Sequence, residues 1–366
     1  MLLARDFLVA IVLLPPSLGL SPRTASPRRA GCPRLQASAS PSPVALFTSE
    51  VCLGHEPGAK GKKADGTPNL HPEQVERLAT LLRAMRGSWK SEFGSLMQVH
   101  EPEADVTEEQ LLRVHTKDYL ETLNQKFAQS QRRPPMRVNL DRDTVISAGS
   151  QAAALRAAGL VIAAVDAVLG GGPSHHPEQP SRAFVMARPP GHHAETSKCG
   201  GFCLFNNVLI GVAHAQAVHG VANVAILDFD VHHGNGDAEI SWCDPTRLYA
   251  STHEEALWPG TGAVTGCDGL HGQILSQPLP PDCSSELFRQ AWRDEIFPAV
   301  RKFGAEVVFL SAGSAPCPVP QPRPPSAPHI PCIVKSGDAP PLHLRLHSIG
   351  MIECLPVPRR RLRRPR

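Results

Sequence analysis

Two acidic residues and two histidines lie within six residues of one another, at the end of the apolar run in "VAILDFDVHHGNGDAE" (224–239). Side chains two apart in a strand face the same way, so Asp228, Asp230 and His232 would converge at its end if the strand stays extended that far. Carboxylate oxygen and imidazole nitrogen suit zinc, and a catalytic zinc takes three protein ligands plus an open position for water. The spacing therefore predicts a zinc site with Asp230 and His232 as two of its ligands.

This segment also resembles a calcium loop and a simple hydrogen-bonded turn. Asp228, Asp230 and Glu239 fall at positions 1, 3 and 12 of a calcium loop, but His233 occupies position 6, where such loops require glycine, and a strand precedes the segment instead of a helix. A loop whose histidines are merely hydrogen-bonded would explain either histidine alone. It explains poorly two acids and two histidines in so short a stretch.

A second cluster lies in "MARPPGHHAETSKCGGFCLFNN" (186–207), where a predicted strand ends at Arg188 and a rigid Pro-Pro-Gly turn presents His192 and His193. A tandem histidine after a turn is, by itself, usually a surface feature. Its position after a second strand of the same predicted sheet favours a role in chemistry. Adjacent histidines beside a zinc site are suited to act as general base and general acid for a metal-bound water.

These clusters need a sheet to bring them together, and the sequence predicts one. Short apolar runs bounded by polar residues, Gly or Pro predict strands, and longer runs with helical apolar spacing predict helices. This alternation is typical of a doubly wound α/β domain with a parallel sheet, in which ligands collect at the carboxyl ends of the strands. The predicted strands lie within 182–189, 223–230, 246–253 and 305–313, and the helices within 147–172, 205–220 and 284–304.

Composition bounds the remaining possibilities. The 366 residues are 42% hydrophobic, which is enough for one large core, and the net charge of +3 does not mark the chain as a nucleic-acid binder or a membrane-surface protein. The 37 prolines are crowded toward the two ends. We therefore expect one central domain between two segments of different character.

The end segments carry the predictions about location. Residues 1–44 contain an apolar run, Phe7 to Leu14, that resembles a signal-peptide core followed by a transit-like stretch; the alternative is a disordered extension or a misplaced start codon. The run is too short to span a bilayer, so no transmembrane segment is expected in the mature chain. Residues 314–366 are rich in Pro and Arg, which predicts disorder or sequence foreign to the fold. The N-terminus suggests an organelle or the secretory route, and the Arg run suggests the nucleus, with nucleus or cytoplasm as the alternative.

Together the segments "RPPGHHAE", "GFCLFNN" and "LDFDVHHGNG" resemble the zinc-dependent histone deacetylase family, and the Asn of "HHGNG" resembles its class II branch and related amidohydrolases. The likeness covers residues 45–313. The resemblance implies the arginase-like α/β fold, a mostly parallel sheet flanked by helices, and no direct nucleic-acid binding by the domain. Further matching segments are "HPEQVERL", "VHTKDYLE", "DRDTVISAGS", "WPGTG" and "VVFLSAG".

The resemblance assigns metals to the first cluster. Asp230 and His232 match two of the family's three zinc ligands. A structural potassium is implied near Asp228, Asp230, His232 and Ser251, bound largely by backbone carbonyls. The implied chemistry is amide hydrolysis, in which zinc polarises the acetyl carbonyl and lowers the pKa of its water.

The second cluster supplies the proton-transfer groups of that reaction. His192 and His193 match the family's tandem catalytic pair, and Asp228 and Asn235 match the partners that orient the two imidazoles. A histidine would remove a proton from the water, and the same histidine or its neighbour would protonate the departing amine.

The substrate channel is implied by three further positions. Gly201, Phe202 and Trp258 match the walls of a narrow tunnel that accepts an acyl-lysine side chain. Asp141, in "LDRDT", matches loosely a rim aspartate that holds the substrate backbone.

The sequence departs from the family after Gly313. There the family continues with Phe-Asp, whose Asp is the third zinc ligand, but this chain continues with Ser314 and Ala315. It also has no "GGY" tyrosine to stabilise the oxyanion, a loss that typically costs about 100-fold or more in rate. We therefore expect a poor enzyme or none. A truncated or misread gene model explains this departure better than an evolved inactive protein does. Without the final strands, an apolar edge of the sheet would be exposed.

Three functions remain open at this point. The first is deacetylation of acetyl-lysine on histones or other proteins. The second is deacylation of small acetylated amines such as polyamines, and the third is a non-catalytic relative, which the absent Asp and Tyr favour. A non-catalytic relative would not need the intact histidine pair.

Overall fold

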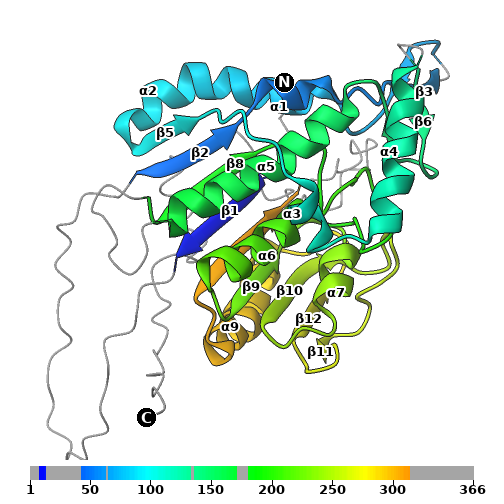
Figure 1. The fold of residues 1–366 in the computed structure, drawn as a ribbon. Coiled ribbons are helices and arrows are strands. Elements are labelled where there is room, and N and C mark those ends of the chain that lie inside the picture. The colour runs from blue at the N-terminus through cyan, green and yellow to red at the C-terminus, as the bar shows by residue number, and fades with distance from the viewer. Residues whose placement is uncertain (1–7, 14–42, 63–64, 133–135, 171–179, 314–366) are drawn as a thin grey trace, which may run out of the picture.

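The computed structural model describes residues 8–13, 43–62, 65–132, 136–170 and 180–313 (Figure 1). Their centre is a nine-stranded sheet in the order β11-β12-β10-β9-β13-β1-β8-β2-β5. Ser314, Ala315 and the rest of the Pro/Arg-rich segment lie outside the described residues. The strands are β1 (Leu8–Leu13), β2 (Val44–Thr48), β5 (Met97–His100), β8 (Arg182–Met186), β9 (Val224–Asp228), β10 (Arg247–Glu254), β11 (Gly266–Asp268), β12 (Ile274–Leu279) and β13 (Val307–Ala312).

The sheet is mostly parallel, as predicted. Strand β9 pairs in parallel with β10 and β13, and β2 pairs in parallel with β5 and β8. Asp228 at the end of β9 lies opposite Ser251 on β10 and Ser311 on β13. The carboxyl ends of these strands therefore meet at one edge of the sheet. The acid and histidine cluster follows β9 at this edge.

Strand β1 runs antiparallel to both of its neighbours, and the edge strand β11 runs antiparallel to β12. Residues Leu8–Leu13, within the 1–44 segment predicted to be targeting-like or disordered, form β1 between β13 and β8, antiparallel to both. The edge of β13 that we expected to be exposed is therefore paired. A short apolar run has the same pattern in a buried strand and in a signal-peptide core, so periodicity could not separate the two.

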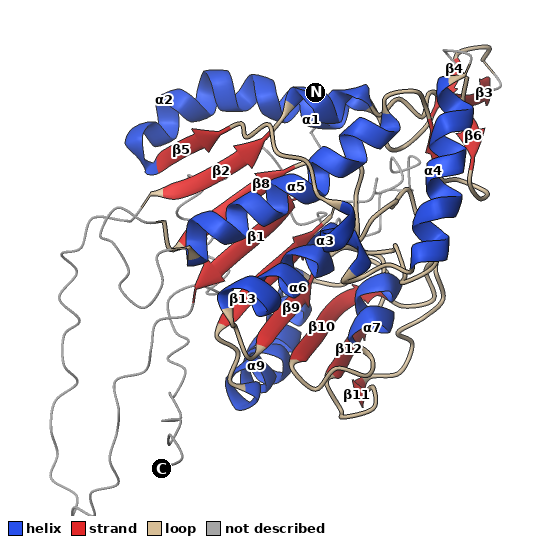
Figure 2. Cartoon of the chain, in the orientation of Figure 1, coloured by secondary structure: helices blue, strands red, loops and turns tan. Residues whose placement is uncertain are grey.

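Helices cover both faces of the sheet (Figure 2). Alternate strand residues face opposite layers: Val224 and Ile226 of β9 join the larger core with α5 and α6, whereas Ala225 and Leu227 join a second core with α8 and α9. The helices are α1 (Val75–Ala84), α2 (Lys90–Phe93), α3 (Glu108–Leu112), α4 (Lys117–Gln131), α5 (Ser150–Leu169), α6 (Asn207–His219), α7 (Asn235–Ser241), α8 (Ser285–Ala291) and α9 (Phe297–Phe303), with π-helical turns at Met85–Trp89 and Trp292–Ile296 and 3-10 turns at Glu50–Gly54 and Gly94–Leu96.

Helix α5 is the one described helix that is long and apolar enough to cross a membrane. Its most apolar stretch is 61% buried within the protein, and it packs against α6 and β8. A core helix of a globular domain has these same properties, so α5 adds little support for membrane insertion.

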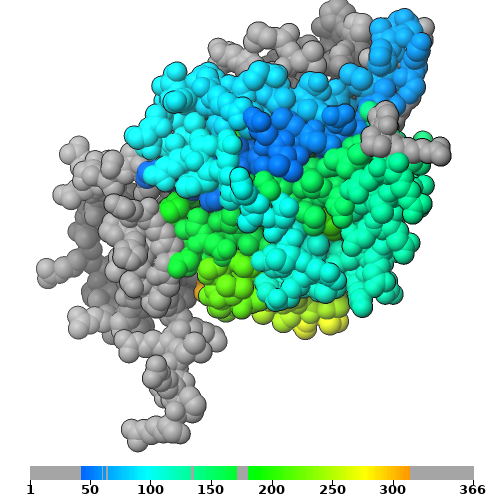
Figure 3. Space-filling view, turned by 45° about the horizontal axis from the view of Figure 1, so that its top comes forward, coloured from blue at the N-terminus to red at the C-terminus, as the bar shows by residue number. Residues whose placement is uncertain are grey.

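Two small hairpins lie beside the main sheet. Strands β3 (Ala59–Lys62) and β4 (Pro68–Leu70) form one, and β6 (Val138–Asn139) and β7 (Val145–Ile146) form the other. Figure 3 shows that the first part of the domain, from β2 to α4 and coloured blue to cyan, gathers on one face of the molecule. The β6–β7 hairpin carries Asp141 toward the site described next.

Candidate active site

The segment with two acids and two histidines turns as soon as β9 ends. The strand stops at Asp228, whose Oδ1 accepts the N–H of Asp230 at 3.0 Å; Asp230 Oδ1 in turn accepts the N–H of His232 at 2.7 Å. Asp230 and His232 do lie together, as predicted. Strand alternation is not the cause, because β9 ends at Asp228. Carboxylates that cap the backbone of a bend bring Asp230 and His232 together, and His232 Nδ1 lies 3.1 Å from Asp230 Oδ1.

The donor atoms of this bend fit a zinc ion. Asp230 is 1% exposed, and its Oδ2 has no hydrogen-bond partner among the described residues. Burial favours a raised pKa for Asp230, but the charge of His192 and the contacts of His232 hold it well below its usual range. A buried carboxylate with an unpaired oxygen beside an imidazole is suited to a cation, and oxygen and nitrogen ligands of this kind suit zinc.

The tandem histidines follow β8 in a loop that is anchored on both sides. Arg188, which precedes it, is buried and forms a two-point contact with Glu73, while its Nη1 donates to the carbonyl of Cys52 at 3.0 Å. The N–H groups of Gly236 and Asp237, at the start of α7, donate to the carbonyl of the first histidine at 3.0 and 3.2 Å. The loop is therefore fixed in place by charge pairing and by a helix N-terminus.

His192 is paired with a carboxylate. Its Nδ1 lies 2.9 Å from Asp228 Oδ2, an oxygen that also accepts from the Tyr249 hydroxyl at 3.3 Å. Tyr249 is itself held by the N–H of Gly234 at 3.0 Å. Burial works to lower the pKa of His192, but the negative charge of Asp228 outweighs it and raises that pKa to about 9. The carboxylate of Asp228 therefore favours the charged form of this imidazole.

His193 is paired with an uncharged amide. Its Nδ1 lies 2.8 Å from Asn235 Oδ1, and its ring centre lies 3.8 Å from that of His192. Burial and the neighbouring His192 charge hold the pKa of His193 well below its ordinary value. The site thus places a neutral imidazole directly beside a charged one.

The predicted tunnel wall lies against these groups. The ring centre of Trp258, in the loop after β10, is 4.6 Å from that of His193 and 6.1 Å from that of His232. A Cβ on Gly201 would lie 2.3 Å from His193 Cδ2 and 2.7 Å from Trp258 Cη2. Only glycine fits at position 201. Gly201 and Trp258 therefore form one closely packed wall with His193 and His232.

Phe202 and Asp141 belong to a supporting network. The N–H of Phe202, at a φ of 70°, donates to Thr144 Oγ1 at 3.2 Å, and His71 contacts the Phe202 ring edge-on at 4.8 Å. Asp141 accepts from the N–H groups of Asp143 and Thr144 and from the Thr144 hydroxyl. Both oxygens of the predicted rim aspartate thus hold its own turn, which in turn holds Phe202.

Comparison with known proteins supports the resemblance to histone deacetylases. A profile of the histone deacetylase domain matches residues 71–316. The chain is 31% identical to histone deacetylase 14, chloroplastic, of Arabidopsis thaliana, over 73% of this chain and 61% of that protein, which is less than two thirds of its length. It is 33% identical to a histone deacetylase-like amidohydrolase of Pseudomonas aeruginosa, over 74% of this chain and 69% of that protein. The crystal structure of the HDA15 HD domain superposes with a TM-score of 0.60 and 26% identity, over 73% and 71% of the two chains.

The chain belongs to the histone deacetylase family. The family membership that the motifs predict is confirmed, and so is the arginase-like α/β fold with a mostly parallel sheet between helices. As a member of a family of hydrolases that act on amides, the chain carries its tandem histidines and its Asp-His pair at the carboxyl edge of the sheet. The assignment of individual roles to these residues is still a prediction.

Sequence reasoning missed several residues that this histone deacetylase-family site uses. Glu73 lies in the matching segment HPEQVERL, where its sequence gives it no role, yet it anchors Arg188. Tyr249 lies in a strand away from the two motifs, and its hydroxyl holds Asp228. Glu195 follows the tandem histidines by two residues, and its carboxylate accepts from Asn235 Nδ2 at 2.6 Å. Their only sequence signal is proximity to a motif, because the contacts join distant segments.

A second group of potential metal ligands lies away from this site. Asp166 of α5 and His214 and His219 of α6 place their ligand atoms within 4.8 Å of one another. Both imidazole Nε2 atoms lie 2.7 Å from Asp166 Oδ1, and Arg113 Nη1 lies 3.4 Å from His214 Nδ1. An arginine can only donate, so His214 Nδ1 accepts and its Nε2 carries the hydrogen toward Asp166. The group is a hydrogen-bonded cluster, and it is not the predicted zinc site.

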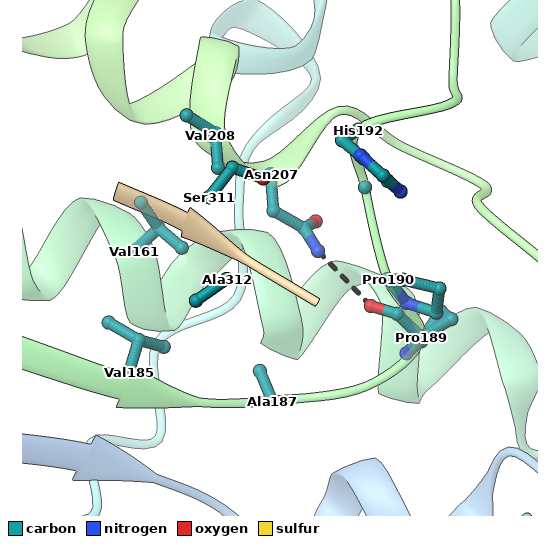
Figure 4. Close-up of a pocket in the computed structure, with 11 residues that line it drawn as sticks. Val161, Val185, Ala187, Pro189, Pro190, His192, Asn207, Val208, Ser311 and Ala312 are labelled. Atoms are coloured by element: carbon teal, nitrogen blue, oxygen red, sulfur yellow. Dashed lines mark hydrogen bonds between the residues drawn. The ribbon is translucent and has the colours of Figure 1, made fainter. Parts of the chain in front are cut away.

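A small cavity lies behind His192 (Figure 4). It is bounded by the ends of β8 and β13, by Val161 of α5 and by the start of α6. Asn207 Nδ2 donates across it to the carbonyl of Pro189 at 3.1 Å. Its lining is mainly apolar, and His192 forms part of it.

Proposed function

We propose that the chain hydrolyses the amide bond of acetyl-lysine on histones or other proteins, with zinc held by Asp230 and His232. One observation carries the proposal. Two adjacent buried imidazoles have different partners, a carboxylate for His192 and an amide for His193, and they stand beside the unpaired Oδ2 of Asp230. A hydrogen-bonded structural pair would not need one charged and one neutral member.

The residues of the chain account for the proton transfers of such a reaction. Bound zinc would polarise the acyl carbonyl and make a water more acidic. His193 is neutral, and with its Nδ1 hydrogen directed at Asn235 its Nε2 accepts a proton from the attacking water. His192, stabilised as a cation by Asp228, places positive charge next to the developing oxyanion. The departing amine takes up a proton from this pair.

The wall beside the pair suits a slender substrate. Gly201 and Trp258 approach His193 so closely that a single added carbon would collide with both rings. A long unbranched chain such as an acetylated lysine, or a small acetylated amine such as a polyamine, meets that requirement. Trp258 is 47% exposed, so it forms the outer part of the wall.

We also propose a potassium ion near Asp228 and Ser251, bound largely by backbone carbonyls. The register of β9 against β10 places these two buried residues side by side, next to the bend that carries Asp230 and His232. Its role there would be to hold that bend in shape.

A second candidate function is a non-catalytic one. The sequence after Gly313 is Ser314-Ala315, which offers no carboxylate at the point where the family supplies its third zinc ligand. Such a protein would bind acetylated ligands without turnover.

The test is release of acetate from an acetyl-lysine peptide and from an acetylated polyamine by the zinc-loaded chain. His193→Ala should abolish release, and His219→Ala, in the distant cluster, should leave it unchanged. Release that depends on zinc and on His193 supports the deacetylase, and the preferred substrate identifies its class. Binding of the peptide without any release would instead support the non-catalytic candidate.

A further inference from the structure

We infer that Glu195 is a positioning residue that fixes the tautomer of His193 through the side-chain amide of Asn235. The three side chains form a linear series. Asn235 Nδ2 donates to Glu195 Oε1 at 2.6 Å, and Asn235 Oδ1 lies 2.8 Å from His193 Nδ1. The catalytic consequence rests on the proposed function, but the tautomer itself does not.

The inference follows from what each group can donate or accept. A carboxylate only accepts, whereas a primary amide donates from nitrogen and accepts at oxygen. Glu195 therefore requires the Nδ2 end of Asn235, which leaves the Oδ1 end for His193. Facing an acceptor, His193 Nδ1 must carry the hydrogen, so Nε2 keeps its lone pair for the proton of the attacking water.

The reversed amide would have the opposite effect. If Asn235 turned over, Nδ2 would face His193, and Nδ1 would have to accept. The hydrogen would then lie on Nε2, and the imidazole could not take up a proton there. His192 needs no such third residue, because Asp228 is itself a carboxylate and accepts with either oxygen. The neutral partner of His193 is the reason that Glu195 is required.

The fold holds Glu195 in position. Its N–H donates to the carbonyl of Lys198 at 2.9 Å, and its own carbonyl lies 3.1 Å from His115 Nδ1. Burial lowers the pKa of His115 to about 4, and its Nε2 accepts the N–H of Asn206 at 3.0 Å, so Nδ1 carries the hydrogen and donates to Glu195. Next along the chain, the N–H and hydroxyl of Thr196 donate to Glu239 at 3.0 and 2.7 Å. The carboxylate is therefore presented by a fixed turn.

The test is nitrogen NMR of the metal-free protein labelled on histidine, at neutral pH, with the His193 signals identified by their loss in His193→Ala. The unmodified chain should show hydrogen on Nδ1. Glu195→Ala should give a mixture of the two tautomers. Glu195→Ala combined with Asn235→Asp should restore the single tautomer, because a carboxylate at position 235 accepts in either orientation. An unchanged tautomer in Glu195→Ala overturns the inference.

Two further variants serve as controls for the tautomer measurement. Glu239→Ala breaks the neighbouring contacts to Thr196 without touching Asn235, and it should leave the tautomer as it is; a shift would mean that the turn, not the amide, is responsible. Glu195→Leu keeps much of the size of the side chain but offers no acceptor to Asn235 Nδ2. If Glu195→Ala does not fold, a mixed tautomer in Glu195→Leu supports the inference and a single Nδ1 tautomer refutes it.

Activity provides a separate readout. In the zinc-loaded protein, loss of such an orienting contact should lower kcat/KM about 10- to 100-fold in Glu195→Ala, with most of it regained in the double variant. If the unmodified chain releases no acetate at all, the proposed function fails, and the NMR result still decides the role of Glu195.

Discussion

Removal of Glu73 should destabilise the protein far more than removal of a surface glutamate in a comparable ion pair. The Glu73 carboxylate is fully buried and meets Arg188, which is 2% exposed, through Nε at 2.9 Å and through Nη2. In Glu73→Ala, the described contacts leave the guanidinium with the carbonyl of Cys52 as its anchor. Loss of one partner of a buried pair costs about 3–5 kcal/mol, because the remaining charge is uncompensated.

The matched control is Glu50→Ala. Glu50 meets Arg86 at 2.7 Å, but the two side chains are 58% and 52% exposed. Exposed pairs contribute about 0–1 kcal/mol, because water and salt screen them. The two variants thus remove the same side chain from ion pairs that differ in burial.

The assay is urea unfolding of both variants and of the unmodified chain at pH 7, followed by far-UV circular dichroism. A double variant, Glu73→Leu with Arg188→Met, should recover much of the loss, because it removes both charges together. A loss in Glu73→Ala no larger than in Glu50→Ala would refute the reasoning, since the buried charge would then carry no penalty.

The same pair predicts how stability depends on acidity. Burial favours a raised pKa for Glu73, but the charges of Arg188 and His55 outweigh burial and lower it below its ordinary 4.5. A lowered pKa in the folded state means that the contribution is complete above pH 4.5 and is lost as the pH falls through the lowered value. Glu73→Ala should therefore lose less stability than the unmodified chain over that acid range.

Three further outcomes follow from the site. Asp230→Asn should weaken zinc binding, measured by equilibrium dialysis, by at least about tenfold, whereas Glu239→Gln should not. Because the pKa of His192 is raised from 6.5 to about 9, its contribution to the stability of the metal-free protein is complete below pH 6.5 and is lost as the pH rises through 9; thermal unfolding should show this loss, and His192→Gln should not. Gly201→Ala should abolish acetate release and lower the melting temperature, because the added carbon displaces the His193 ring and the φ of 53° strains an alanine.

The sequence predicted the layout of the site better than its geometry. Residues that follow strands of a parallel sheet must meet at one edge, so the neighbourhood of His193 and Asp230 could be inferred without coordinates. The way in which Asp230 meets His232 could not, because it depends on backbone N–H groups that turn back onto carboxylates within the bend. Strand alternation also groups Asp230 with His232, because they are two residues apart. The predicted pair is therefore correct although the strand ends before it.

Other features are invisible to sequence reasoning for physical reasons. Glu195 is two residues from the tandem histidines, yet its role depends on the orientation of an amide 40 positions away. The placement of β1 depends on two strand edges, those of β8 and β13, that exist only after the rest of the sheet has formed. In both cases the decisive partner is supplied by the fold, and the pattern of the segment itself is compatible with other structures.

The proposed zinc site has Asp230 and His232 as two ligands and needs a third. Strand β13 lies beside β9 in parallel register, with Ser311 opposite Asp228, so β13 ends at the edge of the sheet where Asp230 and His232 lie. By resemblance to the family, position 315 should supply the third ligand, and this chain has Ala315 there.

Ala315→Asp should therefore tighten zinc binding, measured by equilibrium dialysis, by more than about tenfold, because a direct ligand contributes at least as much as the outer contacts whose loss costs that factor. Ser314→Asp adds the same charge one residue earlier and is the matched control for simple attraction between zinc and a nearby carboxylate. Equal tightening by both variants would mean that charge alone acts there. No tightening by Ala315→Asp would mean that the residues after Gly313 do not approach the Asp230–His232 pair, although the family match continues to residue 316.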